Sequence, residues 1–118
     1  MNVEEFRDFC LSFADVTESF PFDDKVLVFK VGNKMFALAD IEDYEFINLK
    51  CDPERAILLR EEYDEIKPGY HMNKKLWNSV YITGSLEMNF IQDLITDSYN
   101  LIVASLSKRE QERIKNLQ

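Results

Sequence analysis

The stretch from Lys67 to Asn78 holds the densest set of side chains that could do chemistry in this sequence. Its members are cations, amides and aromatic rings in an expected turn between two short extended segments: Lys67, Tyr70, His71, Asn73, Lys74, Lys75, Trp77 and Asn78. Lysine contacts phosphates, asparagine can read base edges, and tyrosine or tryptophan can stack on bases. The stretch also has an architectural interpretation, in which the two large aromatic residues join the core and the asparagines satisfy buried backbone groups. Both interpretations stay open.

His71 is the only histidine, so it is the natural candidate for a general base or a metal ligand. A zinc site needs three or four ligands, and the other soft donors are the two distant cysteines, Cys10 and Cys51. A nucleophilic pair of Cys51 and His71 is conceivable, but no third orienting residue is suggested by the sequence. We therefore predict no catalytic residues, no metal and no cofactor, and a chain that is not an enzyme.

The remaining polar and glycine residues form no recognisable catalytic motif. The carboxylates at 61–65 cluster at an expected helix end, which is usually a solvated surface, and spacing alone identifies no acid and base pair. The three glycines are isolated from one another, so no phosphate-cradling glycine motif is present.

The first half of the chain predicts one helix followed by strands. A helix is expected over about residues 3–14, where Asn2 and Glu5 have capping-box spacing, and residues 15–22 are expected to be a connection. Strands are expected at 26–31 and 34–39, and the Gly32-Asn33 pair between them suits a tight hairpin turn. A third strand at about 45–51 alternates so that Ile47, Leu49 and Cys51 point inward.

The second half predicts two further helices around a pair of strands. Asp52-Pro53 is a strong helix start, and that helix should reach about residue 63. Residues 66–82 return to short extended segments broken near 72–75. The longest helix should run from about Leu86 or Asn89 to Leu106, and Ser107 should cap a last helical piece.

These elements predict one α+β domain over residues 1–118 in two layers. The order is α-β-β-β-α-β-β-α, with an antiparallel sheet of about five strands and the helices on one of its faces. At 118 residues and 46% apolar composition, the chain is long enough to bury one core without disulfide or metal staples.

Composition and charge restrict the setting and the partners. No apolar run is long enough to cross a membrane, and the start of the sequence is acidic, so we expect a cytoplasmic protein with two reduced, buried thiols. The net charge is −8, and residues 1–24 and 42–65 each carry −6, whereas residues 66–82 carry +3. An acidic protein repels nucleic acid at long range, so a basic island would bind it weakly. The oligomeric state is left open.

Several segments resemble successive landmarks of the MmcQ/YjbR family. They are Phe20-Pro21-Phe22, residues 34–38, Asn48 through Pro53, Lys67 through Asn78 and residues 98–103, in the expected order. The resemblance implies a two-layer fold similar to CyaY-like and secretion-chaperone-like domains, whose members are described as DNA-binding with the hairpins as wings. This sequence departs from the pattern at Leu76, where the family more often has histidine, and at Asp23-Asp24, where it more often has a glycine-containing turn.

Three functional hypotheses follow from the residues and the resemblance together. The first is a non-enzymatic binding module that contacts nucleic acid through the 66–82 turn. The second is a protein-interaction or chaperone-like module, which the acidic charge favours. The third is a small-ligand binder or enzyme, and a deep pocket lined by His71 and carboxylates would favour it.

Overall fold

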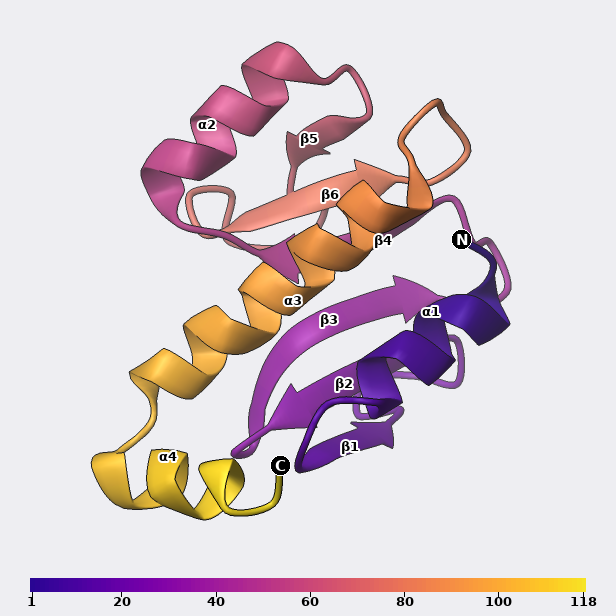
Figure 1. The fold of residues 1–118 in the computed structure, drawn as a ribbon. Helices are drawn as coiled ribbons and strands as arrows, with labels where there is room; N and C mark the ends of the chain where they lie inside the picture. Colours follow the sequence, from indigo (N-terminus) through magenta and orange to yellow (C-terminus); the bar gives the residue numbers. More distant parts are fainter.

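The computed structural model describes all residues from 1 to 118 as four helices and six strands (Figure 1). In chain order the elements are α1 (Val3–Leu11), β1 (Val16–Ser19), β2 (Val26–Val31), β3 (Lys34–Asp40), β4 (Phe46–Lys50), α2 (Pro53–Glu62), β5 (Ile66–Pro68), β6 (Trp77–Tyr81), α3 (Met88–Ser105) and α4 (Lys108–Lys115). The predicted α+β class is therefore confirmed.

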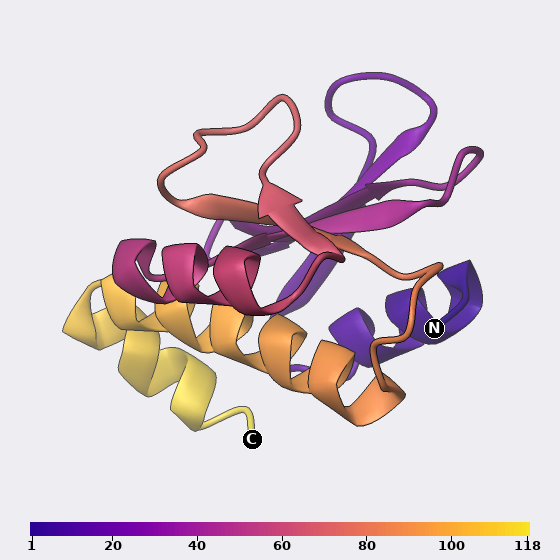
Figure 2. The ribbon, with the colours of Figure 1, turned by 90° about the horizontal axis from the view of Figure 1, so that it is seen from above.

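The strands form one antiparallel sheet in the order β1-β2-β3-β4-β6-β5, and the helices lie on one of its faces (Figures 1 and 2). The two-layer arrangement is thus as predicted. The sheet has six strands rather than about five, because residues 16–19 form an edge strand where a connection was expected. This strand has four residues and pairs only with β2, so it shows too short a pattern to be recognised.

The turn between β2 and β3 is the hairpin that Gly32-Asn33 predicted. Gly32 and Asn33 have φ angles of 56° and 64°, in the left-handed region that glycine and asparagine tolerate. Space also restricts this position, since a Cβ on Gly32 would lie 2.6 Å from Cδ1 of Leu106. The hairpin is therefore held directly against the end of the longest helix.

The predicted helix starts agree with the structure better than the predicted helix ends do. The side chains of Asn2, Asp52 and Ser107 cap α1, α2 and α4 as predicted. The first helix ends at Leu11 rather than near residue 14, and α3 begins at Met88, with no side-chain cap. The observed start lies between the two expected starts, Leu86 and Asn89.

The main core lies between the sheet and the helices. Alternation along the strands sends Leu27, Phe29, Ile47 and Leu49 to this side, where α1 contributes Phe6. Both cysteine thiols are free, but only Cys10 is fully buried, and Cys51 is half-buried at the edge of the core. The prediction of two buried thiols was thus wrong for Cys51.

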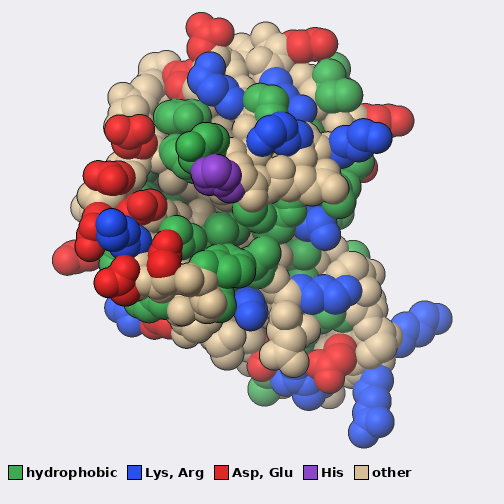
Figure 3. Space-filling model, turned by 180° about the vertical axis from the view of Figure 1, so that it is seen from behind, with side chains coloured by type: hydrophobic (Ala, Val, Ile, Leu, Met, Phe, Trp, Pro, Cys, Tyr) green, Lys and Arg blue, Asp and Glu red, His purple; other side chains and the backbone are tan.

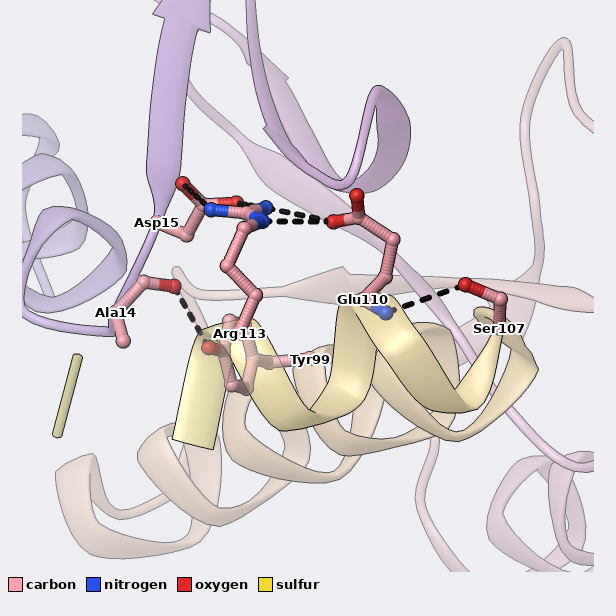
Figure 4. Close-up of polar contacts among 6 residues, drawn as sticks. All are labelled: Ala14, Asp15, Tyr99, Ser107, Glu110 and Arg113. Atoms are coloured by element: carbon pink, nitrogen blue, oxygen red, sulfur yellow. Dashed lines mark hydrogen bonds and ion pairs between the residues drawn. The ribbon is translucent and has the colours of Figure 1, made fainter. Parts of the chain in front are cut away.

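The last helix is fastened to the turn before β1 by Arg113 (Figure 4). Its guanidinium donates to both carboxylate oxygens of Asp15, at 3.2 and 2.6 Å, and to Glu110. Beside it, the hydroxyl of Tyr99 donates to the carbonyl of Ala14 at 2.7 Å. The hydrogen bonds from Arg113 hold the pKa of Asp15 below its usual value.

We predict that Asp15→Asn weakens the fold at neutral pH and that this loss becomes smaller in acid. Because folding lowers the pKa of Asp15, its contribution is present above the unfolded value of about 3.9 and is lost as the pH falls through the folded value. The pair is partly exposed, so the loss should be less than about fivefold in the folding equilibrium constant.

Urea unfolding at pH 7 and at pH 2.5 measures this difference. Asn tolerates the positive φ of 65° at this position, so the substitution tests the charge rather than the backbone. Asp24→Asn, at an exposed carboxylate that makes no ion pair, is the matched control. An equal loss at both pH values would contradict the ion-pair explanation.

Candidate functional site

A pocket of about 750 Å³ lies on the face of the sheet that the helices leave open. The loops at 20–25 and 69–76 stand above this face, as Figure 2 shows, and the 41–45 loop lies at the ends of β3 and β4. In Figure 3 hydrophobic side chains gather in a hollow there, with acidic side chains along one flank. The residues that line the pocket are Phe22, Val26, Met35, Leu38, Ala39, Asp40, Asp43, Glu45, Phe46, Asn48, Tyr70, His71, Met72 and Asn73.

The floor of the pocket is apolar because the strands carry apolar side chains on both faces. Val26 and Val28 alternate with the core residues of β2 and therefore point to the open side. Val28, Leu38 and Trp77 form a second, smaller cluster there, separate from the main core. Trp77 is only 7% exposed, so it serves as packing beneath the pocket rather than as a free stacking surface.

A hydrogen-bond network on the floor fixes the 69–76 loop over the sheet. The buried Asn48 donates through Nδ2 to the carbonyl of Tyr70 at 3.2 Å and accepts from the hydroxyl of Ser79 at 2.5 Å. The same hydroxyl accepts from the backbone N–H of Tyr70 at 2.9 Å. Since each polar atom in this network has a partner, the loop is held in one position, and the wall it forms is present without a ligand.

The loop presents an aromatic wall. The rings of Tyr70 and His71 lie 4.1 Å apart between centroids, and Phe46 meets Tyr70 edge to face at 5.9 Å. His71 has a φ of 60°, in the left-handed region that few residues other than glycine adopt and in which histidine is more common than most. Phe22, on the 20–25 loop, also lines the pocket and is 64% exposed.

Three carboxylates, those of Asp40, Asp43 and Glu45, line the pocket at the ends of β3 and β4. One oxygen of Asp40 accepts from the backbone N–H groups of Glu42 and Asp43 at 2.9 and 3.0 Å, which fixes the turn. None of the ion pairs of the chain includes these three carboxylates. No lysine or arginine lines the pocket either, so the charged side chains of its lining are all acidic.

The structure separates the residues that the sequence placed on one candidate surface. Tyr70, His71 and Asn73 line the pocket, and Trp77 lies in the cluster beneath it. The carboxamide of Asn73 also accepts from the backbone N–H of Lys75 at 2.9 Å, so this residue has an architectural role as well.

The lysines and the last asparagine lie outside the pocket. Lys67 and Lys75 are exposed, whereas the ammonium of Lys74 donates to the carbonyl of Gly69 at 2.7 Å and so helps close the turn. Asn78 is on the helix side, where it is 2% exposed and accepts from Nε of Arg60 at 2.7 Å. Of the two interpretations of this stretch, the architectural one therefore holds for Trp77 and Asn78, which are both buried. They point to opposite faces of the sheet because adjacent strand residues alternate.

The other candidates from the sequence do not come together. Cys51 packs at the edge of the main core on the helix side, whereas His71 lies on the open face. Burial raises the pKa of the Cys51 thiol, which disfavours the reactive thiolate. No group of three or more His, Cys, Asp or Glu side chains is placed to hold a metal ion.

The sequence reasoning missed the carboxylates and most of the floor. The sequence singled out no carboxylate between residues 40 and 45, and spacing could not show that Asp40, Asp43 and Glu45 border a cavity. A usable signal for the floor existed in Val26-Leu27-Val28-Phe29, an unbroken apolar run. Such a run indicates a strand covered on both faces, so it could have predicted that something covers the open side.

An antiparallel sheet with helices on one face and a loop-walled pocket on the other defines the class of this protein. The chain matches the family model described as YjbR over residues 11–101, and it belongs to that family. It is 47% identical over 96 residues to the uncharacterized protein YbdF of Escherichia coli O157:H7, covering 80% of this chain and 79% of that one. It is 30% identical to the uncharacterized protein YjbR of Escherichia coli K12, and the match covers 99% of this chain and 100% of that protein.

Solved structures show the same fold. The crystal structure of the Deinococcus radiodurans protein DR2400, of domain DUF419, superposes with a TM-score of 0.90 at 38% identity, over 97% of this chain and 88% of that one. The crystal structure of a Pseudomonas syringae protein, target PsR293, superposes with a TM-score of 0.73 at 30% identity. The match covers 86% of this chain and 98% of that one. No helix of this chain is long and apolar enough to span a membrane.

We predict that Asn48→Ala loosens the wall of the pocket as well as the fold. The substitution leaves the Tyr70 carbonyl and the Ser79 hydroxyl without this partner, at a cost of about 1–3 kcal/mol. Amide exchange at Tyr70 should accelerate more than exchange in α3. Asn89→Ala, at an exposed position on α3, is the matched control. Unchanged exchange at Tyr70 would show that the network does not hold the loop.

Proposed function

We propose that this protein is a non-enzymatic binding protein that holds a small ligand with an apolar body in the pocket on the open face. The pocket itself carries the proposal. Its volume of about 750 Å³ lies within the range of about 300–1,000 Å³ that is usual for small-ligand sites. A pocket that combines His71 with carboxylates is also the feature by which the sequence analysis distinguished a ligand binder from its rivals.

The lining fits this proposal in its composition and its rigidity. Eight of the 14 lining residues are hydrophobic, and the polar groups are few and lie at the rim or on the floor. Such a mixture gives affinity through apolar contact and orientation through the polar groups. The network around Asn48 holds one wall in place, so binding would not have to order that loop.

The surroundings of His71 support binding without turnover. A catalytic histidine is usually oriented by a hydrogen bond from a third group, and the imidazole of His71 makes no hydrogen bond within the chain. Its ring instead lies against Tyr70 as part of the aromatic wall.

We predict that the neutral probe 1-naphthalenemethanol binds in this pocket. In ¹⁵N-labelled protein, its titration should shift the amide resonances of the 20–25, 41–45 and 69–76 loops. Phe22→Ala should weaken binding about two- to tenfold, since it removes an aromatic contact. Phe20→Ala is the matched control, because Phe20 is 45% exposed and does not line the pocket. No shifts up to the solubility limit of the probe, or shifts scattered over the helix side, would overturn the proposal.

Nucleic-acid contact by the 66–82 turn stays a prediction, and the structure sharpens its test. Lys67 and Lys75 are exposed, whereas Lys74 is engaged with the turn. Two phosphate contacts would give a log–log salt slope of about −1.8 on duplex DNA.

Fluorescence anisotropy with a labelled duplex measures that slope. Lys67→Glu with Lys75→Glu should abolish binding, and Lys108→Glu with Lys115→Glu on α4 makes the same charge change elsewhere as a control. Equal loss in both variants would mean that only the net charge matters and that the turn is no site.

A further inference from the structure

We propose that the ligand of this pocket is an organic cation, an ammonium or guanidinium group carried on a flat or compact apolar body. This inference rests on the proposed function and adds the charge of the ligand to it. It follows from the carboxylates that line the pocket, from the absence of lysine and arginine among the lining residues, and from the aromatic wall.

The three carboxylates at the pocket belong to the acids of this chain that form no ion pair. Glu18, Asp97 and Asp15 are each paired with an arginine, at N–O distances of 2.6, 2.5 and 2.6 Å. Within the 40–45 segment, Glu42 does not line the pocket and is paired with Lys25 at 3.7 Å. The three acids of this segment that do line the pocket have no basic partner in the chain.

Three unpaired negative charges in one short segment repel each other across a partly enclosed space. An anionic ligand would add to that repulsion, and a neutral one would leave it unchanged. A cation would relieve it, and one carboxylate at about 4 Å strengthens its binding about fivefold even when water screens the charge fully. The charge of the pocket therefore selects a ligand of positive sign.

The rings at the pocket fit the remainder of such a ligand. Phe46, the first residue of β4, and Glu45 just before it both line the pocket, so an aromatic surface and a carboxylate border the same cavity. Tyr70 meets Phe46 edge to face, and Phe22 stands on the facing loop. Aromatic faces attract cations as well as apolar groups, so both parts of the ligand would find partners.

A metal cation fits less well than an organic one. A bound calcium or magnesium ion needs several oxygen ligands converging at about 2.0–2.6 Å. No three acidic, histidine or cysteine side chains of the chain are grouped closely enough for that. The carboxylates are spread along the rim, where they can face a diffuse organic charge above an apolar floor.

Three probes with the same ring and different charges test this inference. They are 1-naphthylmethylamine, which is a cation at pH 7, neutral 1-naphthalenemethanol, and anionic 1-naphthoate. Isothermal titration at low salt should show the amine binding at least about fivefold more tightly than the alcohol, and the carboxylate more weakly than both. Raising the salt to 1 M should shrink the difference between amine and alcohol, since the Debye length falls to about 3 Å.

Substitutions locate the preference. Asp43→Asn with Glu45→Gln should bring the amine-to-alcohol affinity ratio to about one and leave the fold unchanged, because both side chains are exposed and make no hydrogen bond that holds the fold. Asp40 is left intact because it fixes the turn. Glu62→Gln with Asp64→Asn makes the same charge change beyond the pocket and should preserve the preference.

The outcomes separate the two proposals. If the alcohol binds in the pocket and the amine gains nothing over it, the cation inference is overturned and the pocket stands. The same holds if the preference survives Asp43→Asn with Glu45→Gln, or is lost equally in the control pair. If none of the three probes binds, the proposed function fails and the cation inference fails with it.

Discussion

The sheet carries apolar side chains on both faces, and the helices cover only one of them. On the covered side, α1 and α3 pack over Leu27, Phe29 and Ile47 and complete a conventional core. On the other side, Val28, Leu38 and Trp77 would meet water if nothing lay above them. The loops cover part of this face, as a second layer of helices would, and the space that they leave unfilled is the pocket. The site is thus a consequence of an incomplete layer.

Strand β4 connects this arrangement to the chemistry of the pocket. Its residues alternate between a core of Ile47 and Leu49 and an open face that holds Asn48. A buried amide there would be costly without partners, and it has them in the Tyr70 carbonyl and the Ser79 hydroxyl. The buried amide of Asn48, which needs hydrogen-bond partners on the open face, is therefore also the group that positions the aromatic wall.

The fold was largely predictable because it depends on local signals. The caps at Asn2, Asp52 and Ser107 and the hairpin at Gly32-Asn33 each act within a few residues, so sequence spacing reveals them. The edge strand β1 was missed because its four residues form a strand only through pairing with β2, which is a tertiary effect.

The site was less predictable, for a physical reason that its residues illustrate. Composition drew attention to the run from Lys67 to Asn78, and Tyr70, His71 and Asn73 of that run do line the pocket. Asp40, Asp43 and Glu45 come from a segment that is distant in sequence and looks like ordinary solvated surface. Those carboxylates border a cavity only because loops from distant parts of the chain fold over the sheet. The spacing of residues in the sequence does not show which loops will lie over which strands.

The contacts that α3 and α4 make with the turn before β1 have a consequence for the order of folding. Arg113 and Asp15 are 98 positions apart, and Tyr99 and Ala14 are 85 apart, so these bonds close loops that include most of the chain. Closing such loops costs entropy that local helices and hairpins do not have to meet. The β2–β3 hairpin can form early, whereas the turn before β1 gains its final partners only after the C-terminal helix has been synthesised. During translation, the edge of the sheet at β1 should therefore be the last part to become protected.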